Sequence, residues 1–585
     1  MDIQQRFKDR IDVLGSKPKE ALPFDTSVPA YKAWEDQLSI VNTQETTALM
    51  ASASHALVNT PINPIDKLLL LNATHDFLFK LSQVCLEGIQ KSTFPLSEKQ
   101  SAISSQLIET LLNISLGYLG LICSAEFTKN DSNTDKQTPH FSVNEKTLIL
   151  FKSFEFLSLI QFIKALIYRL PQEPFWNQVN ALFLLAETHQ LSQIVFPCLD
   201  GEHTSTIEDE FKKIQFFNLA QTNRFRQNDM VTIRSILASL ANGISLSSTS
   251  GESFSFVVDL NSAIPARHTS ETTSTSGQTR FMSNASLINY LLNKDSIAEE
   301  KQGVIALNSR QAKLSKKVIQ RLLPCWQTKV VRQATRHSQT ETIVIYPGLE
   351  SIIKALVLQK DPNAYEQLQN QNTAASSVNI NDLELTPIDD TGAFKDNVFI
   401  KDNSSITQQL KVSAKNAFSS DKIWSKERVS IAGEKGTKIT AETQDTSLQG
   451  LRFTVSPDNK YLIKVTDLVG IRTQNDAIQL AIVRRINSLD DGCVSVGVEM
   501  MAPKIKLAHL YRKNNKKPHK TVLFLQGIPA IKQADSIISS SVIEERDLTV
   551  TAEYNSQKKL FTIEQAIEIN QVFSHYSVLI KTVID

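Results

Sequence analysis

Two short polar patterns in the sequence carry residue types that bind phosphate and guanine groups. The first is a pair of arginines, Arg332 and Arg336, with three residues between them. The second places a carboxylate, a hydroxyl and a glycine in close succession, at Asp445, Ser447 and Gly450. A guanidinium group pairs with phosphate oxygens or with guanine O6 and N7. A carboxylate accepts hydrogen bonds from the N1 and N2 donors of guanine, and a short hydroxyl can form a further hydrogen bond to the ligand. A glycine lets the backbone approach the base because it has no Cβ atom.

The spacing of the two arginines is compatible with two geometries. On a helix, residues four apart share one face, so Arg332 and Arg336 would grip one ligand together. On a flexible arm, they would fold over the ligand as it binds. The alternative interpretation of these arginines is a solvated face after a helix. For Asp445 and Ser447 the alternative is a turn cap before a strand.

The rest of the sequence lacks the patterns that are typical of enzymes. It contains no HExxH, no pair of histidines at metal spacing and no GxSxG turn. The segment 433–438 lacks the GK[ST] ending of a phosphate-binding loop. The five cysteines form no CxxC pair and indicate neither a zinc cluster nor a disulfide framework. We therefore expect no catalytic residue, no metal site and no cofactor.

Length and composition indicate several soluble domains in a reducing compartment. A chain of 585 residues is too long for one hydrophobic core. The net charge of +1 favours neither a nucleic acid polymer nor an anionic membrane as partner. The N-terminal segment has no apolar core of a signal peptide, and the apolar run 107–123 is too interrupted and too short to cross a bilayer. We expect a cytoplasmic protein without a transmembrane segment.

The elements that must position the two patterns follow a helical N-terminal half. Between about residue 60 and residue 245, apolar residues recur every three and four positions. This predicts an all-α domain over 1–245, in which 107–123 is a buried core helix. Residues 246–323 are predicted as a linker with an isolated strand at 252–259 and connecting helices, the last of which should end at Pro324.

The C-terminal half is predicted to be rich in β-structure. Short strand-like segments separated by turn residues indicate an antiparallel sandwich or barrel. A further strand at 341–346, a helix at 349–359 and a mostly disordered polar insertion at 361–423 precede them. Residues 505–585 are predicted as a small β-rich unit. The main strand-like segments are 451–455, 461–465, 468–472, 478–486 and 494–500, followed by 520–526, 547–553 and 559–564.

The order of the two polar patterns resembles that of PilZ domains, which carry RxxxR followed by (D/N)xSxxG at the entry to a strand. The segment 481–500 also resembles the late strands of that family. The resemblance covers about 320–505. It implies a PilZ-like β-barrel at 324–504 that binds cyclic di-GMP through the five residues named first: Arg332, Arg336, Asp445, Ser447 and Gly450. The two patterns are farther apart than is usual in the family.

The resemblance implies an α+β multidomain protein: an all-α helical domain, an antiparallel PilZ-like barrel and a β-rich C-terminal unit. Such a protein would be a bacterial cyclic di-GMP receptor and not an enzyme. It would couple nucleotide binding to a protein partner, through the helical domain, in the control of motility, pili or exopolysaccharide. The alternative is a degenerate PilZ-shaped interaction scaffold that binds no nucleotide.

Overall fold

The computed structural model divides the chain into two compact units. The first comprises Met1–Ile343 with Thr440–Pro503, and the second comprises Val344–Ile439 with Lys504–Asp585. The expected polar insertion at 361–423 lies outside the described residues. The structure describes residues 7, 21–124, 127, 140–198, 204–271, 276–293, 316–327, 337–338, 340–360, 438–447, 450–458, 463–473, 477–512, 520–527, 534–543, 548–554, 557–569 and 572–584.

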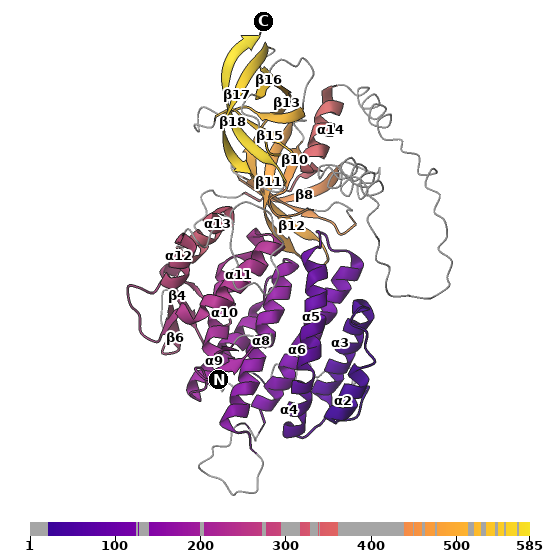
Figure 1. The fold of residues 1–585 in the computed structure, drawn as a ribbon, viewed down its shortest axis with the longest axis vertical. Coiled ribbons are helices and arrows are strands. Elements are labelled where there is room, and N and C mark those ends of the chain that lie inside the picture. The colour runs from indigo at the N-terminus through magenta and orange to yellow at the C-terminus, as the bar shows by residue number, and fades with distance from the viewer. Residues whose placement is uncertain are drawn as a thin grey trace, which may run out of the picture. The chain divides into compact units, whose positions relative to one another are not determined.

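The N-terminal part of the first unit is an array of helices, which confirms the prediction of a helical region (Figure 1). At its centre, α8 (Val143–Leu166) packs against α6 (Glu98–Ile122) and α10 (Ile207–Leu219). Buried residues occur on all sides of α8, as expected for a helix in the interior. The other helices are α2 (Val28–Glu35), α3 (Thr43–Asn59), α4 (Pro64–Ala73), α5 (His75–Gln90), α9 (Glu173–Thr188) and α11 (Gln227–Leu240).

Local sequence signals explain where the two longest helices of this array begin. Ser142 caps α8 and forms a capping box with Glu145. Ser97 caps α6, because its hydroxyl accepts from the Gln100 backbone N–H at 3.3 Å. As predicted, α6 is a buried core helix. In the part of the chain that the structure describes, no helix has the length and apolar character needed to span a membrane.

The strand predicted at 252–259 is not isolated. It belongs to a small antiparallel sheet in the order β3-β6-β4-β5. The sequence pattern did not reveal its neighbours because these are only two to five residues long. The strands are β3 (Ser245–Ser247), β4 (Phe256–Asp259), β5 (Arg267–His268) and β6 (Thr279–Ser283); a further two-stranded sheet pairs β1 (Phe196–Pro197) with β2 (Thr204–Ser205).

After α12 (Ala285–Leu292), the helix α13 (Lys316–Gln327) passes through Pro324, so the prediction that this proline ends the helix was wrong. A proline inside a helix forfeits one backbone hydrogen bond. Here the helical course continues because Cys325 and Trp326 are both buried, at 4% and 0% exposure. Their burial offsets the lost bond.

Six strands then form a closed antiparallel barrel in the order β10-β11-β12-β9-β8-β7. This confirms the predicted barrel. The predicted helix at 349–359 is α14 (Gly348–Lys360), which follows β7. The strands are β7 (Thr342–Pro347), β8 (Ile439–Ser447), β9 (Gly450–Val455), β10 (Leu468–Arg472), β11 (Ile478–Ser488) and β12 (Val494–Ala502).

The C-terminal β-rich region is itself a closed six-stranded barrel, in the order β13-β14-β15-β18-β17-β16. Its core contains Val522, Phe524 and Phe561. When the second barrel is read in the opposite direction, both barrels have the same strand order: fourth, fifth, sixth, third, second and first. The C-terminal region therefore repeats the topology of the first barrel. Its strands are β13 (Ile505–Arg512), β14 (Lys520–Leu525), β15 (Ser536–Ser539), β16 (Leu548–Tyr554), β17 (Gln557–Ile569) and β18 (Ser574–Ile584).

Within the first unit, the helical array contacts one end of the first barrel. Ile463 lies in a segment predicted as a strand, but it makes an isolated backbone bridge to Phe94 of the array instead. The guanidinium group of Arg226, at the start of α11, donates to the carbonyl of Val465 at 2.9 Å. It also contacts the carboxylate of Asp467 at 3.3 Å. Polar backbone groups of the loop before β10 are thus satisfied by the helical array.

We expect replacement of Arg226 by methionine to lower the free energy of unfolding by about 3 kcal/mol. Burial raises the pKa of Asp229, one turn further along α11, and the Arg226 charge opposes that rise. Without Arg226 the buried carboxylate loses this compensation. A carboxyl whose pKa is raised in the folded state costs stability as pH rises above its ordinary value near 3.8. The deficit of the variant should therefore grow with pH, measured by denaturant unfolding.

The control for this prediction is Arg267→Met, which removes the same charge from β5, a strand of the separate small sheet. Equal losses of stability in the two variants, or a deficit in Arg226→Met that does not change with pH, would contradict the role assigned to Arg226.

The C-terminal barrel contains a histidine that should make its stability depend on pH. Burial lowers the pKa of His575 below its ordinary value near 6.5, although Glu568 acts in the opposite direction. Its Nε2 atom is buried without a hydrogen-bond partner in the described structure. The folded state resists protonation, so stability is complete above about pH 6.5 and declines as pH falls toward the lowered pKa.

We expect the unfolding temperature of the C-terminal barrel to fall between about pH 7.5 and about pH 5.5. The variant His575→Leu should show a smaller fall, and His509→Leu, at an exposed position of β13, should behave like the unmodified protein. Thermal unfolding followed at several pH values tests this. Parallel pH profiles for all three proteins would argue against His575 as the cause.

Candidate functional site

The hairpin of β8 and β9 brings three of the predicted residues onto one face of the first barrel. Residues directly opposite each other on antiparallel strands, and residues two apart on one strand, project to the same side. Ser447 lies opposite Gly450, and Asp445 lies opposite Arg452. Asp445, Ser447 and Gly450 therefore share one face. The burial pattern of β9, in which Leu451 and Phe453 are buried, makes this the outer face.

A β-bulge is the reason that Asp445 faces outward. The register of β8 against β9 shifts between Thr443 and Asp445. Thr443 lies opposite the fully buried Phe453, on the inner face. In a regular strand, Asp445 would project to that same inner face, whereas the extra residue, Gln444, moves it to the outer face. The bulge thus converts a core position into a position on the barrel surface.

Asp445 is held by an arginine that the sequence patterns did not indicate. The Arg452 guanidinium lies 2.8 Å from the Asp445 carboxylate. Asp445 is 8% exposed, while the Arg452 side chain is 39% exposed. The ion pair fixes the carboxylate at the surface of the barrel. The available signal was the alternation of β9, in which Arg452 occupies the outward position between two apolar residues.

Gly450 has a structural requirement of its own. A Cβ atom built on Gly450 would lie 2.2 Å from the backbone oxygen of Val498 on β12. No side chain fits at that distance, so a glycine is needed where β9 and β12 approach each other. The Ser447 hydroxyl donates to the Gly450 carbonyl at 3.0 Å, and this hydrogen bond links the two sides of the turn between β8 and β9.

Arg332 and Arg336 lie outside the described residues, but the chain on both sides of them is placed. Directly after Arg336, His337 and Thr446 exchange two backbone hydrogen bonds, of 2.9 and 3.0 Å. Thr446 stands between Asp445 and Ser447. The residue that follows Arg336 in the chain is therefore paired with the strand that carries the second pattern. His337 itself is exposed.

On the other side, the arginine segment leaves the helical array at the end of α13. The Trp326 indole donates to the Phe216 carbonyl of α10 at 3.1 Å. The Asn284 side chain donates to the Trp326 carbonyl at 2.6 Å. Residues 328–336 therefore connect a fixed helix end to a fixed strand. We call this segment the tether.

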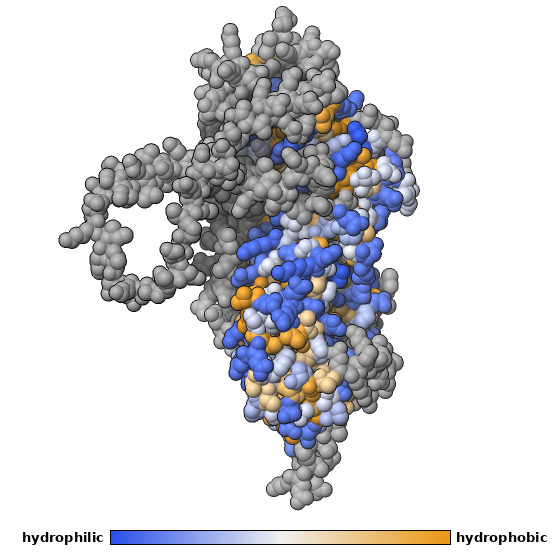
Figure 2. Space-filling view, turned by 90° about the vertical axis from the view of Figure 1, so that its right-hand side faces the viewer, coloured by the Kyte–Doolittle hydropathy of each residue, from blue (hydrophilic) through white to orange (hydrophobic). Residues whose placement is uncertain are grey.

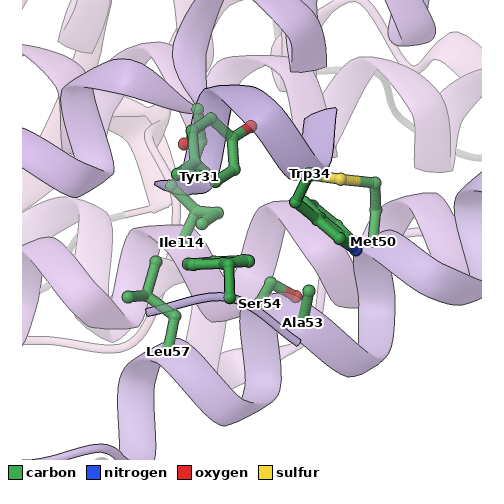
Figure 3. Close-up of a pocket in the computed structure, with 9 residues that line it drawn as sticks. Tyr31, Trp34, Met50, Ala53, Ser54, Leu57 and Ile114 are labelled. Carbon is green, nitrogen blue, oxygen red and sulfur yellow. The ribbon is translucent and has the colours of Figure 1, made fainter. Parts of the chain in front are cut away.

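The cavity shown in Figure 3 is too small for a nucleotide. The cavity in Figure 3 is lined mainly by apolar side chains and has a volume of about 10 Å³, room for one water molecule at most. Among the described residues, no group of three or more His, Cys, Asp or Glu is placed to hold a metal ion. The residues labelled in Figure 3 are Tyr31, Trp34, Met50, Ala53, Ser54, Leu57 and Ile114.

The fold and the outer-face residues define a helical domain joined to a barrel of the PilZ class. Comparison with family descriptions agrees: residues 29–250 match "Cyclic-di-GMP receptor FimW, N-terminal domain", and residues 255–506 match "Cyclic-di-GMP receptor FimW, middle PilZ domain". The chain belongs to the FimW family of cyclic di-GMP receptors. A receptor family implies a non-catalytic role. The comparisons with curated proteins and with solved structures found no match.

Proposed function

We propose that cyclic di-GMP binds to the outer face of the first barrel, at Asp445, Ser447 and Gly450, and that Arg332 and Arg336 of the tether close over it. The observation that carries this proposal is the pair of backbone hydrogen bonds between His337 and Thr446. They join the arginine pattern to the strand that presents the Asp445 carboxylate. The carboxylate would accept from guanine N1 and N2, and the guanidinium groups would bind phosphate.

We further propose that the tether passes nucleotide binding to the helical domain. The residues at its two ends, Trp326 and His337, both make hydrogen bonds to the rest of the first unit. If the arginines move toward a ligand, α13 would therefore shift with them. The helix α13 packs on α10 of the helical domain and on α12, which follows that domain in the chain. A shift of α13 would change the surface that the helical domain offers to a protein partner in motility, pilus or exopolysaccharide control. Cytoplasmic localisation fits this role and stays a prediction.

The position of the tether, and not an apolar patch on the surface, is our reason for placing the docking surface of the partner. On the face shown in Figure 2, small groups of hydrophobic residues alternate with hydrophilic ones. Scattered apolar residues of this kind are usual on protein surfaces. We therefore propose that a partner docks near α12 and α13, the helices whose position would change when the nucleotide binds.

Calorimetric titration with cyclic di-GMP, combined with hydrogen exchange, tests both parts. We expect saturable binding, with GTP as a control ligand, and slower amide exchange in α13 and residues 337–341 when the nucleotide is present. Binding without any change of exchange in α13 would reject the coupling and leave the site in place. An absence of binding would favour the alternative, a PilZ-shaped scaffold that docks partners without a nucleotide.

A further inference from the structure

The register of four neighbouring strands places two arginines in one row with Asp445. Asp445 of β8 lies opposite Arg452 of β9. Arg452 in turn lies opposite Gly497 of β12. Gly497 lies opposite Arg485 of β11. Residues directly opposite project to one face, so the four positions form a continuous row across the outer face of the barrel. We call it the arginine row.

A second bulge brings Arg485 into this row. The register of β11 against β12 shifts between Val483 and Arg485. Val483 is fully buried, and in a regular strand a residue two positions further would also face inward. The shift moves Arg485 to the outer face, as the first bulge does for Asp445. Two independent irregularities thus converge on one surface, and bulges commonly re-aim side chains at functional sites.

The glycine in the row leaves space between the arginines. The Nε atom of Arg485 lies 3.7 Å from the position that a Cβ on Gly497 would take, so this side chain extends over the glycine. Adjacent strands are about 4.8 Å apart, which puts the Cα atoms of Arg452 and Arg485 about 10 Å from each other. Side chains of that length can reach a common ligand above Gly497.

Arg452 retains hydrogen-bonding capacity in this arrangement. One terminal nitrogen of its guanidinium pairs with Asp445, while its Nε atom is buried without a hydrogen-bond partner in the described structure. Buried donors are normally satisfied, so this nitrogen would gain a partner if the Arg452 side chain turned toward a bound group. A phosphate oxygen is the strongest acceptor for a guanidinium group.

We propose that Arg452 and Arg485 belong to the nucleotide site and bind the phosphodiester groups of the cyclic dinucleotide, with the side-chain-free Gly497 between them. The inference rests on the proposed function of the Asp445 face and extends it by two strands. The nucleotide would then lie along the arginine row, with its phosphate groups over Arg452 and Arg485.

The test is calorimetric titration of the full chain with cyclic di-GMP. We expect Arg485→Gln to weaken binding about tenfold, equivalent to about 1.4 kcal/mol. Gly497→Leu should weaken it as well, because the larger side chain displaces Arg485. Arg485→Lys should give an intermediate loss of affinity, since lysine keeps the charge but lacks the two parallel N–H donors of the guanidinium group. Arg267→Gln, which removes one charge from β5, should bind as the unmodified protein does.

Salt distinguishes a phosphate contact from a contact with the base. If Arg485 binds phosphate, the difference between Arg485→Gln and the unmodified protein should shrink as salt is raised, because screening weakens exposed ionic contacts. Normal affinity in Arg485→Gln, while Asp445→Ala has lost binding, overturns the arginine row and leaves the proposed function intact. A difference that salt does not change overturns the assignment to phosphate. No binding by the unmodified protein overturns the proposed function itself.

Discussion

Replacement of Asp445 by alanine is expected to weaken cyclic di-GMP binding at least about a hundredfold, or about 2.7 kcal/mol. A carboxylate that accepts from two guanine donors makes two charge-assisted hydrogen bonds, each stronger than a neutral one. The variant should remain folded. Arg452 would lose its ion-pair partner, but its side chain is 39% exposed and its charged end can turn to water. Calorimetry with thermal unfolding in parallel measures both quantities.

The matched control is Glu442→Ala, which removes an exposed carboxylate from the same strand, opposite Thr454. It should bind with unchanged affinity. Residual strong binding in Asp445→Ala would mean a second site. We expect none in 505–585, because that region has arginines only at Arg512 and Arg546 and its single glycine, Gly527, has no Asp, Asn or Ser at the required spacing. Equal losses in both variants would point to a general charge effect.

The fold was predictable where a pattern is long. The helices α6 and α8 span about seven turns each, so their apolar spacing is repeated often enough to be read. The small sheet around β4 was not predictable as a sheet, because its partners are too short to show any alternation. The course of α13 through Pro324 depends on the burial of Trp326 against α10, a tertiary contact that no local rule contains.

The candidate residues could be named from the sequence, whereas their arrangement could not. Asp445, Ser447 and Gly450 follow from residue type and spacing, and they do share one face. Arg452 and Arg485 do not follow, because their position beside Asp445 depends on two bulges. A bulge changes which face a side chain occupies without leaving a clear mark in the sequence. Strand register therefore determines which side chains surround a motif on the barrel surface.

Gly450 shows how a motif residue can have two roles, and its replacement by alanine should separate them. The new Cβ would meet the Val498 backbone oxygen at 2.2 Å, so β9 and β12 must move apart. Overpacking of this kind in a barrel wall costs roughly 3 kcal/mol. We therefore expect a marked fall in the unfolding temperature of the first unit, followed by calorimetry or circular dichroism, whether or not cyclic di-GMP is present.

Gly497→Ala is the matched comparison for stability, because the nearest atoms to its new Cβ are at 3.7 Å, an ordinary contact. That variant should unfold close to the temperature of the unmodified protein. If Gly450 served only to admit the guanine base, Gly450→Ala would bind nucleotide weakly and yet be fully stable. If Gly450→Ala loses stability and Gly497→Ala does not, the glycine at position 450 is needed mainly for the packing of β9 against β12.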